Sequence, residues 1–451
     1  MTYYEITVEV RKRDRLVPVY AGGAYTAQHH VGDDNILFLI ENTNEKEFFA
    51  YCDFLFENGY TLHSENSLSG NLFKTYAADE RLLHLMYIKN ESKTRIISGL
   101  LDDRAMIPTE PITNVVGARP CEVTQIIMDY YQPEPRKDGN FGMCYIVTLD
   151  DGSLIVYDGF ACFSKLDLER FWGLLCEKGI RDEDGKIVIS AWVITHEHQD
   201  HYWGMYRTLL DHGDEIRVKK LFVTVIPLSL IGGAFKGLDG FVTTGRLDEV
   251  FEKTERFDVI RMHTGQKFNI RNAQIEVLYT LEDIFPEREK DFLTFNDTST
   301  VTRISADGHT FMILGDAYQI ASDVMCTMYG KDLKSDVSTV SHHGWWGCSK
   351  ETYNYISPKL FVFPHSRRWF DRFLKMKPDP ENKNQQLYGL FYESTIHTFD
   401  MVDRDFERYL LADHYNKTIT FKTLAVRNEE RFNEQYGNQS DVNSFSKNND
   451  L

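Results

Sequence analysis

The sequence predicts a mixed α/β protein in which helices lie outside a layered sheet, preceded by a small α+β domain. Three observations predict it: a β-β-α-β succession after residue 140, a separate helix-and-strand pattern before residue 112, and prolines between the two. The chain has 451 residues, enough for two or three domains. Its composition, 42% hydrophobic and 26% charged, is ordinary for a globular protein and excludes a disordered or fibrous chain.

Charge and cysteine content narrow the class of function. The formal net charge of −18 argues against broad binding to nucleic acid or to an anionic membrane, because that binding needs clustered Lys and Arg. The seven cysteines form no C-x-x-C pair, which argues against a disulfide framework or a zinc finger. The amino terminus lacks a signal-peptide pattern, and no stretch approaches the roughly 20 apolar residues of a membrane span. We therefore expect a cytoplasmic protein without a membrane segment.

Residues 1–112 are expected to form the small α+β domain, whose role the sequence does not indicate. Apolar residues at near-helical spacing predict a helix over 46–57, which Asn58-Gly59 ends. Strands are predicted over 71–76 and 82–88. Asn71 and His84 could contact a ligand, but ordinary turn and core positions are the favoured interpretation.

The main domain is expected over residues 120–425, followed by a polar, disordered tail over 426–451. Pro108, Pro111 and Pro120 precede the main domain and mark the boundary. Four predicted elements open this domain and give the β-β-α-β succession. They are a hairpin of strands 142–149 and 154–159, a helix over 167–178 and a buried strand over 187–194.

Three histidines and an aspartate follow the buried strand directly, in the segment Thr195-His-Glu-His-Gln-Asp-His201. Because side chains alternate along an extended chain, His196 and His198 lie on one side, where both imidazoles can reach one metal ion. Asp200 and His201, at the turn into the next helix, can face a second ion. Nitrogen and oxygen ligands without a thiolate suit zinc, manganese or iron.

Two later strands end in the residue types that such a site still needs. The strand that starts at Thr310 leads to Asp316, whose carboxylate could bridge two cations. The strand that starts at Asp336 leads to His342 and His343. A strand that ends in Asp or His is common, but together the three segments put ligands at strand ends on one edge of a sheet.

At this point the sequence resembles the metallo-β-lactamase-fold hydrolase superfamily over about residues 120–425. It is most similar to the branch that contains the hydrolase domain of the late-competence DNA-uptake protein and the choline-phosphate esterases. The matching segments are Asp158-Gly159, the histidine motif at 195–201, the Gly265 turn, Asn296-Asp-Thr-Ser299, Leu314-Gly-Asp316 and Ser341-His-His-Gly344.

This resemblance implies an αββα sandwich with two divalent metal ions at its rim. Zinc is favoured over manganese or iron as the metal. The implied ligands are His196 and His198 for the first metal, Asp200 and His201 for the second, Asp316 as the bridge, and His342 or His343 to complete the second site. The other histidine of the last pair would hydrogen-bond the substrate or protonate its leaving group. Asp200, His342 and His343 are therefore the candidate catalytic residues, and Asp158 is expected to support the metal-binding loop.

The sequence departs from the family in one respect. Many members place a further histidine, a third ligand of the first metal, between the second motif and the bridging aspartate. Here His212, His263 and His309 fall in that interval, His263 in a structural turn and His309 after a hairpin turn, where we expect it to be solvated. The alternative support for the first metal or its water is Asn296 or Asp297.

Aromatic and basic residues near the motifs are candidates for substrate contacts. Trp203, Trp345 and Trp346 can line the mouth of the pocket or pack in the core. A later segment carries His365, Arg367 and Arg368, which can meet an anionic substrate or form an exposed basic loop.

The expected activity is hydrolysis by a metal-bound hydroxide, on a phosphoester or phosphodiester of a small or single-ended anionic substrate. The net charge gives no sign of a track for a polyanion, so a nucleic-acid substrate is not expected. Two alternatives stay open. One is a carbonyl-ester hydrolase of the lactonase or thioesterase type, and the other is a non-catalytic, metal-binding interaction module.

Overall fold

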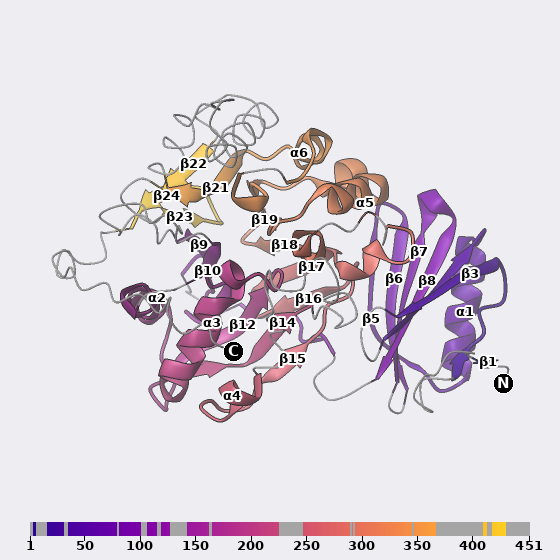
Figure 1. Cartoon of the computed structure of the whole chain (residues 1–451), viewed down its shortest axis with the longest axis horizontal. Helices are drawn as coiled ribbons and strands as arrows, with labels where there is room; N and C mark the ends of the chain where they lie inside the picture. Colours follow the sequence, from indigo (N-terminus) through magenta and orange to yellow (C-terminus); the bar gives the residue numbers. More distant parts are fainter. Residues whose placement is uncertain are drawn as a thin grey trace, which may run out of the picture.

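Figure 1 shows the computed structural model of the chain. It describes residues 3–5, 16–30, 35–78, 81–100, 106–114, 119–126, 142–161, 165–224, 247–288, 291, 294–344, 347–366, 409–412 and 417–429. Within these ranges, no helix is both long and apolar enough to cross a membrane. Three large sheets organise the described residues, one in the amino-terminal part and two in the main body.

The amino-terminal part is a six-stranded antiparallel sheet with one helix on its outer face (Figure 1). The predicted helix is confirmed as α1, and it starts with a capping box: Asn44 accepts a hydrogen bond from the backbone of Glu47, and Glu47 accepts one from the backbone of Asn44. The two predicted strands are confirmed as β6 and β7. The elements are β1 (Tyr3–Glu5), β2 (Leu16–Pro18), β3 (Ala24–His30), β4 (Ile36–Glu41), α1 (Glu45–Glu57), β5 (Thr61–Leu68), β6 (Asn71–Ala78), β7 (Arg81–Ile88), η2 (Lys89–Glu91) and β8 (Lys93–Leu100).

The first sheet of the main body joins antiparallel strands to a parallel set. Strands β11, β12, β14 and β15 run parallel, and β12 is buried along its whole length because neighbouring strands flank it and both of its faces are covered. The predicted hairpin, helix and buried strand are confirmed as β10–β11, α2 and β12. The elements are β9 (Glu122–Gln125), β10 (Cys144–Thr148), β11 (Leu154–Asp158), α2 (Lys165–Lys178), β12 (Ile187–Ile194), α3 (Gln199–His212), η4 (Gly213–Glu215), β13 (Ile216–Val218), β14 (Lys220–Val223), α4 (Leu247–Phe251), β15 (Asp258–Ile260), β23 (Lys417–Thr420) and β24 (Val426–Asn428).

Strand β24 bears on the expected carboxyl-terminal tail. It pairs antiparallel with β23, so residues 426–428, the first three of that tail, belong to the sheet and not to a disordered segment. Pairing of Thr418 with Arg427 supplies backbone hydrogen bonds that a polar composition does not reveal. Residues 430–451 lie outside the described residues.

The second sheet of the main body starts antiparallel and ends parallel. Strands β16 to β19 form an antiparallel meander, and β19 to β22 run parallel. The elements are β16 (Lys267–Ile270), β17 (Ala273–Tyr279), η7 (Leu281–Ile284), η9 (Phe295–Thr298), β18 (Val301–Ala306), β19 (His309–Ile313), α5 (Gln319–Tyr329), η10 (Gly330–Leu333), β20 (Val337–Thr339), η11 (His342–Gly344), α6 (Lys350–Ile356), β21 (Leu360–Ser366) and β22 (Tyr409–Ala412).

These two sheets pack face to face with helices on both outer sides, which confirms the αββα expectation. Alternation along β12 sends Val193 into the core between the sheets and Trp192 outward against the helices of the first sheet. Across the inner core, the rings of Phe222 and Phe268 stack with centroids 4.9 Å apart. Helices α5 and α6 cover the outer side of the second sheet, where Met325 is fully buried.

The amino-terminal sheet packs its other face against the outer side of that second sheet. One hydrophobic core contains Phe73 and Met86 from the amino-terminal part and Leu278 and Met325 from the main body. At the same interface, the amide nitrogen of Asn71 donates to the carbonyl oxygen of Met328 at 2.7 Å. Asn71 is therefore a buried docking residue, as the favoured interpretation of the sequence expects.

His84 lies fully buried in this interface. Its Nε2 is 2.9 Å from the carbonyl oxygen of Thr264 and its Nδ1 is 2.9 Å from the hydroxyl of Thr75, so Nε2 carries the proton and Nδ1 accepts. The ring stacks on that of His263 with centroids 4.9 Å apart. Burial, followed by the nearby His263, lowers the pKa of His84 to about 3, so the folded protein keeps this imidazole neutral.

This neutral histidine predicts a pH-dependent stability. Below pH 6.5 the unfolded chain binds a proton at His84 that the folded chain does not, so the free energy of unfolding falls by about 1.4 kcal/mol per pH unit from this residue alone until the pH reaches about 3. In His84→Gln that contribution is lost, and the difference in stability between wild type and variant shrinks as the pH falls. Urea unfolding between neutral pH and about pH 4.5 measures it. Parallel profiles for the two proteins would contradict the expectation.

Candidate metal centre

Four strands of the sandwich bring polar residues to one rim. Because β11 and β12 run parallel, and β19 and β20 run parallel, the carboxyl ends of each pair lie at the same edge of their sheet. The two edges approach closely at Gly315, where a Cβ atom would lie 2.9 Å from Cβ of Thr195, and where φ is +54°. The residues delivered to the rim are Asp158, the segment 195–201, Asp316 and the segment 341–343.

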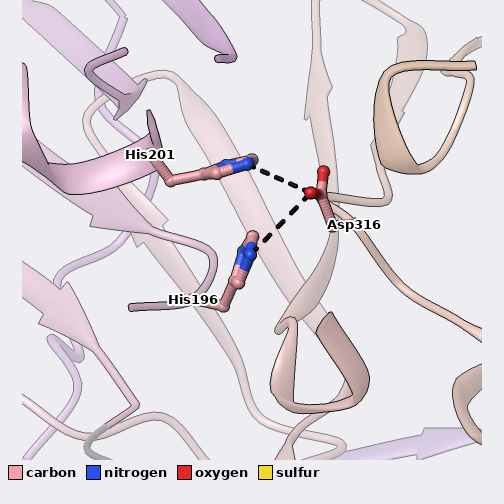
Figure 2. Close-up of side chains that lie close together, drawn as sticks. All are labelled: His196, His201 and Asp316. Atoms are coloured by element: carbon pink, nitrogen blue, oxygen red, sulfur yellow. Dashed lines mark ion pairs between the residues drawn. The ribbon is translucent and has the colours of Figure 1, made fainter. Parts of the chain in front are cut away.

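His196 and His198 face each other directly after β12. Nε2 of His196 lies 2.8 Å from Nδ1 of His198, so these two ring nitrogens contact each other directly. Nε2 of His196 is also 3.9 Å from Oδ2 of Asp316, and Figure 2 marks this pair. The joint binding of one metal ion by His196 and His198 stays a prediction.

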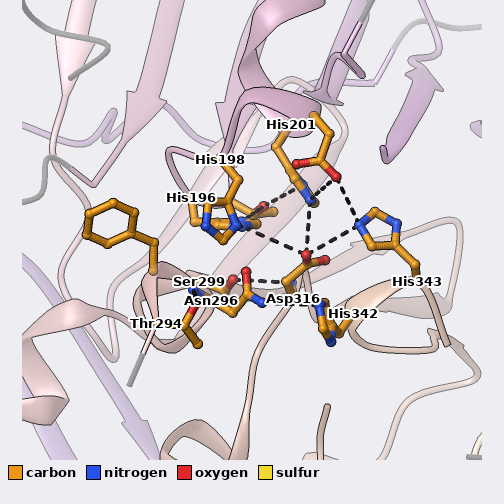
Figure 3. A network of polar contacts seen from close by, with 12 residues as sticks. His196, His198, His201, Thr294, Asn296, Ser299, Asp316, His342 and His343 are labelled. Atoms are coloured by element: carbon orange, nitrogen blue, oxygen red, sulfur yellow. Dashed lines mark hydrogen bonds and ion pairs between the residues drawn. The ribbon is translucent and has the colours of Figure 1, made fainter. Parts of the chain in front are cut away.

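A second group beside Asp316 consists of Asp200, His201 and His343. Figure 3 shows the imidazoles of His201 and His343 pointing toward the carboxylate of Asp316. Nε2 of His201 and Nε2 of His343 each lie 3.3 Å from Oδ2 of Asp316. Nε2 of His343 is also 3.3 Å from Oδ2 of Asp200. The first turn of α3, which His198 caps, places Asp200 and His201 there.

The two neighbouring histidines of η11 point to different partners. Nε2 of His342 lies 3.1 Å from the amide nitrogen of Asn296, and its ring is 4.9 Å from that of Tyr318. Both histidines have left-handed backbones, with φ of 48° for His342 and 56° for His343. Such backbones are unfavourable for residues other than glycine and persist where the surroundings demand them. Of the two residues that the sequence left open, the structure brings His343 to the carboxylates.

Asp158 holds the loop that follows β12. One carboxylate oxygen accepts the backbone N–H of Thr195 at 2.8 Å, and the other accepts Nδ1–H of His201, also at 2.8 Å. Since Nδ1 of His201 donates here, its Nε2 is the ring nitrogen that faces Asp316. The supporting role expected for Asp158 agrees with these contacts.

The electrostatics of the cluster favour a bound cation. Burial alone would raise the pKa of Asp316, but His343 and His201 hold it well below its usual value. Conversely, burial would lower the pKa of His343, yet Asp316 and Asp200 raise it to about 9. Burial lowers the pKa of His196 well below 6.5, which keeps a neutral imidazole with a lone pair available. The carboxylates therefore favour positive charge at His343, and a metal ion that binds there would take the place of a proton, because metal ions bind ionised carboxylates and neutral imidazoles.

The buried donor atoms fit metal binding. Nε2 of His201 and Oδ1 of Asp316 are buried without a hydrogen bond. Within the described residues, two groups have ligand atoms that all lie within 4.8 Å of one another, and the groups share His201. They are His196, His201 and Asp316, and Asp200, His201 and His343. Nitrogen and oxygen donors without a thiolate suit zinc, manganese or iron.

Of the three histidines considered as a third ligand of the first metal, His263 and His212 have other partners. His263 pairs with Glu282, Nδ1 to Oε1 at 2.7 Å. His212 stacks on Trp172. His309 begins β19 and is half-buried, more enclosed than the solvated turn position expected from the sequence, because the strand starts directly after Gly308.

The expected aromatic and basic contacts are partly described. Trp203 packs on Tyr206 with ring centroids 5.3 Å apart and against the core under α3, which is a packing role. Trp345, Trp346, Arg367, Arg368 and the side chain of His365 lie outside the described residues. Sequence reasoning missed Phe295 and Tyr318, whose rings lie beside His198 and His342, because an aromatic residue near a motif is most often core.

Comparison with known proteins gives no family model that matches the chain, and no curated protein matches it either. Solved structures with the metallo-β-lactamase fold do match parts of it. YhfI from Bacillus subtilis is 14% identical, with 54% of this chain and 85% of that chain covered and a TM-score of 0.32. Zinc-bound PqqB from Methylobacterium extorquens is 13% identical over 49% of this chain and 72% of that one, with a TM-score of 0.31.

The diiron β-hydroxylase CmlA from Streptomyces venezuelae is 12% identical, with a TM-score of 0.34. The match covers 69% of this chain and 55% of CmlA, so this chain spans about half the length of that protein. These likenesses are too distant to assign an activity. The description of the site therefore depends on the contacts above.

Asp158 provides a test of the metal centre. In Asp158→Asn, one amide cannot accept both the backbone N–H of Thr195 and Nδ1–H of His201, so His201 loses its fixed orientation. We expect metal affinity to fall about 10- to 100-fold with the fold retained. A chelator competition titration measures it. Asp182→Asn, which alters a carboxylate that accepts backbone hydrogen bonds in a turn before β12, is the control and should bind like wild type. Unchanged affinity in Asp158→Asn would contradict the assigned support.

Proposed function

We propose that this protein is a metal-dependent hydrolase of the metallo-β-lactamase type that cleaves a phosphoester or phosphodiester of a small or single-ended substrate. The observation that carries the proposal is the convergence of His196, His201, His343 and Asp200 around Asp316 at one rim of the sandwich. In the proposal His196 and His198 hold one divalent cation, and Asp200, His201 and His343 hold a second. Asp316 is shared between them.

Two divalent cations in such a site lower the pKa of a water molecule toward neutrality and neutralise the charge that develops in the reaction. The protein fixes the positions of the ligand side chains. Asp158 fixes the orientation of His201, and the left-handed backbone of η11 directs His343 toward Asp200 and Asp316. His342, beside Asn296, is left to contact the substrate or its leaving group.

The preference for phosphorus esters follows from the charge demand of the reaction. Both the attacking and the leaving oxygen of a phosphodiester need charge neutralisation, which a pair of cations about a shared carboxylate can supply to both. A carbonyl ester needs only its carbonyl polarised, so one cation would suffice. A shared carboxylate between two ligand groups therefore favours the phosphorus reaction over a lactonase or thioesterase.

The non-catalytic alternative explains less of the geometry. A metal-binding interaction module has no chemical need for a buried carboxylate between two sets of imidazoles, since burying Asp316 is costly. It also has no need for two left-handed histidines in succession. We therefore favour catalysis over the binding of a partner as the function of this rim.

The first experiment compares wild type with Asp316→Asn. We expect wild type to carry about two equivalents of zinc, manganese or iron and to cleave bis-p-nitrophenyl phosphate. Asp316→Asn should lose metal and at least about 100-fold in turnover, because the carboxylate shared by His201 and His343 is gone. Elemental analysis and release of p-nitrophenol measure the two effects.

Asp211→Asn, on the exposed side of α3, is the matched control and should behave like wild type. Turnover of p-nitrophenyl acetate or a lactone without phosphodiester cleavage would instead favour the carbonyl-ester reaction. A protein that holds no metal, even after reconstitution, would favour the interaction module.

The size of the substrate has its own test. With a net charge of −18 we expect no tight binding of single-stranded DNA. A gel-shift titration at low and at moderate salt measures it. Tight binding that weakens steeply with salt would show an extended binding surface for a polyanion, and it would contradict a small or single-ended substrate.

A further inference from the structure

We infer that Asn296 supplies the side-chain oxygen that completes the metal site at His196 and His198, and that the contact of its amide nitrogen with Nε2 of His342 sets the direction of that oxygen. The inference deepens the proposed function and rests on it. It assigns a ligand to the end of the site where the expected third histidine is missing.

The place of Asn296 in the fold supports the assignment. It lies in η9, between two residues that already contact the centre. The ring of Phe295, before it, lies 5.9 Å from that of His198, and the hydroxyl of Ser299, after it, accepts the backbone N–H of Asp316 at 3.2 Å. In the view of Figure 3, Asn296 lies beside Asp316, between the His196–His198 pair and His342.

The two ends of the amide have different surroundings. Its nitrogen lies 3.1 Å from Nε2 of His342. Its oxygen has no hydrogen-bond partner, although the residue is only 5% exposed. A buried amide oxygen without a partner is unfavourable, so a site that keeps one is expected to bind something there. A cation, or a water held by one, meets that need.

The neighbouring acidic residue cannot take this role as readily. A carboxylate oxygen of Asp297 accepts the backbone N–H of Thr294 at 3.2 Å and so closes the capping box that starts η9. The backbone oxygen of Asp297 accepts the hydroxyl of Tyr279 at 2.7 Å. Asp297 therefore shapes the turn that presents Asn296.

An amide oxygen makes the two ends of the centre unlike. The end at Asp200, His201 and His343 combines two imidazoles with a carboxylate of its own, whereas the end at His196 and His198 gains only a neutral oxygen. Neutral carbonyl oxygen donors suit manganese more than zinc. We expect the end with Asn296 to bind zinc more weakly than the other end does.

Metal titration of substituted proteins tests the inference without depending on activity. Asn296→Leu keeps the size and removes the polar atoms. We expect it to weaken the weaker of two zinc sites about 10- to 100-fold and to leave the tighter one unchanged. Asn296→His, which supplies an imidazole, should strengthen zinc binding at that site, and Asn296→Asp should strengthen manganese binding because it adds a charge. Competition with a chelating dye gives both affinities.

A control completes the design. Asn269→Leu changes a half-buried asparagine on β16 that contacts Glu110 and should bind metal like wild type. If Asn296→Leu fails to fold, Asn296→Asp and Asn296→His decide through their gain of affinity.

The outcomes separate this inference from the proposed function. Wild-type affinities at both sites in Asn296→Leu, or no gain in the histidine and aspartate variants, would overturn the role of Asn296 and leave the hydrolase intact. A wild-type protein that binds no metal would overturn both.

Discussion

The carboxylate of Asp316 is the group on which the arrangement of this rim depends. It is buried, follows β19 of the second sheet, and lies 3.3 Å from the imidazoles of His201 in α3 and His343 in η11. A buried carboxylate is stable only beside positive charge or hydrogen-bond donors. The sandwich must therefore hold both sheet edges in register, and the fully buried strand β12 and the packed inner core provide that rigidity.

Support for the centre extends outward in layers. Asp158 orients His201 and the loop of Thr195, and Ser299 holds the backbone of Asp316. These contacts are made at strand ends and in short 3₁₀ turns, where the backbone can adopt unusual angles without breaking a sheet. The left-handed backbones of Asp158, His342 and His343 all occur there.

The amino-terminal sheet contributes to the same structure from the opposite side of the second sheet. It shares a hydrophobic core with α5 and η7, and its Arg95 pairs with the buried Asp283 at 3.0 Å. Asp283 lies in η7, in the segment that connects β17 to η9 and so to Asn296. The described contacts of the amino-terminal sheet are therefore structural, and they stabilise the segment that leads to the centre.

The sequence by itself determined the layered α/β class, the buried strand, the hairpin and the residues at the rim, because alternation, burial and ligand chemistry are local properties. It could not determine which of His342 and His343 faces the carboxylates. The directions of two adjacent side chains depend on backbone angles, which the sequence does not give. Nor could it place His84 at an interface or extend the sheet through residues 426–428, because these depend on partners nearly 200 and about 10 residues away. Tertiary structure decided them, since only packing brings distant hydrogen-bond partners together.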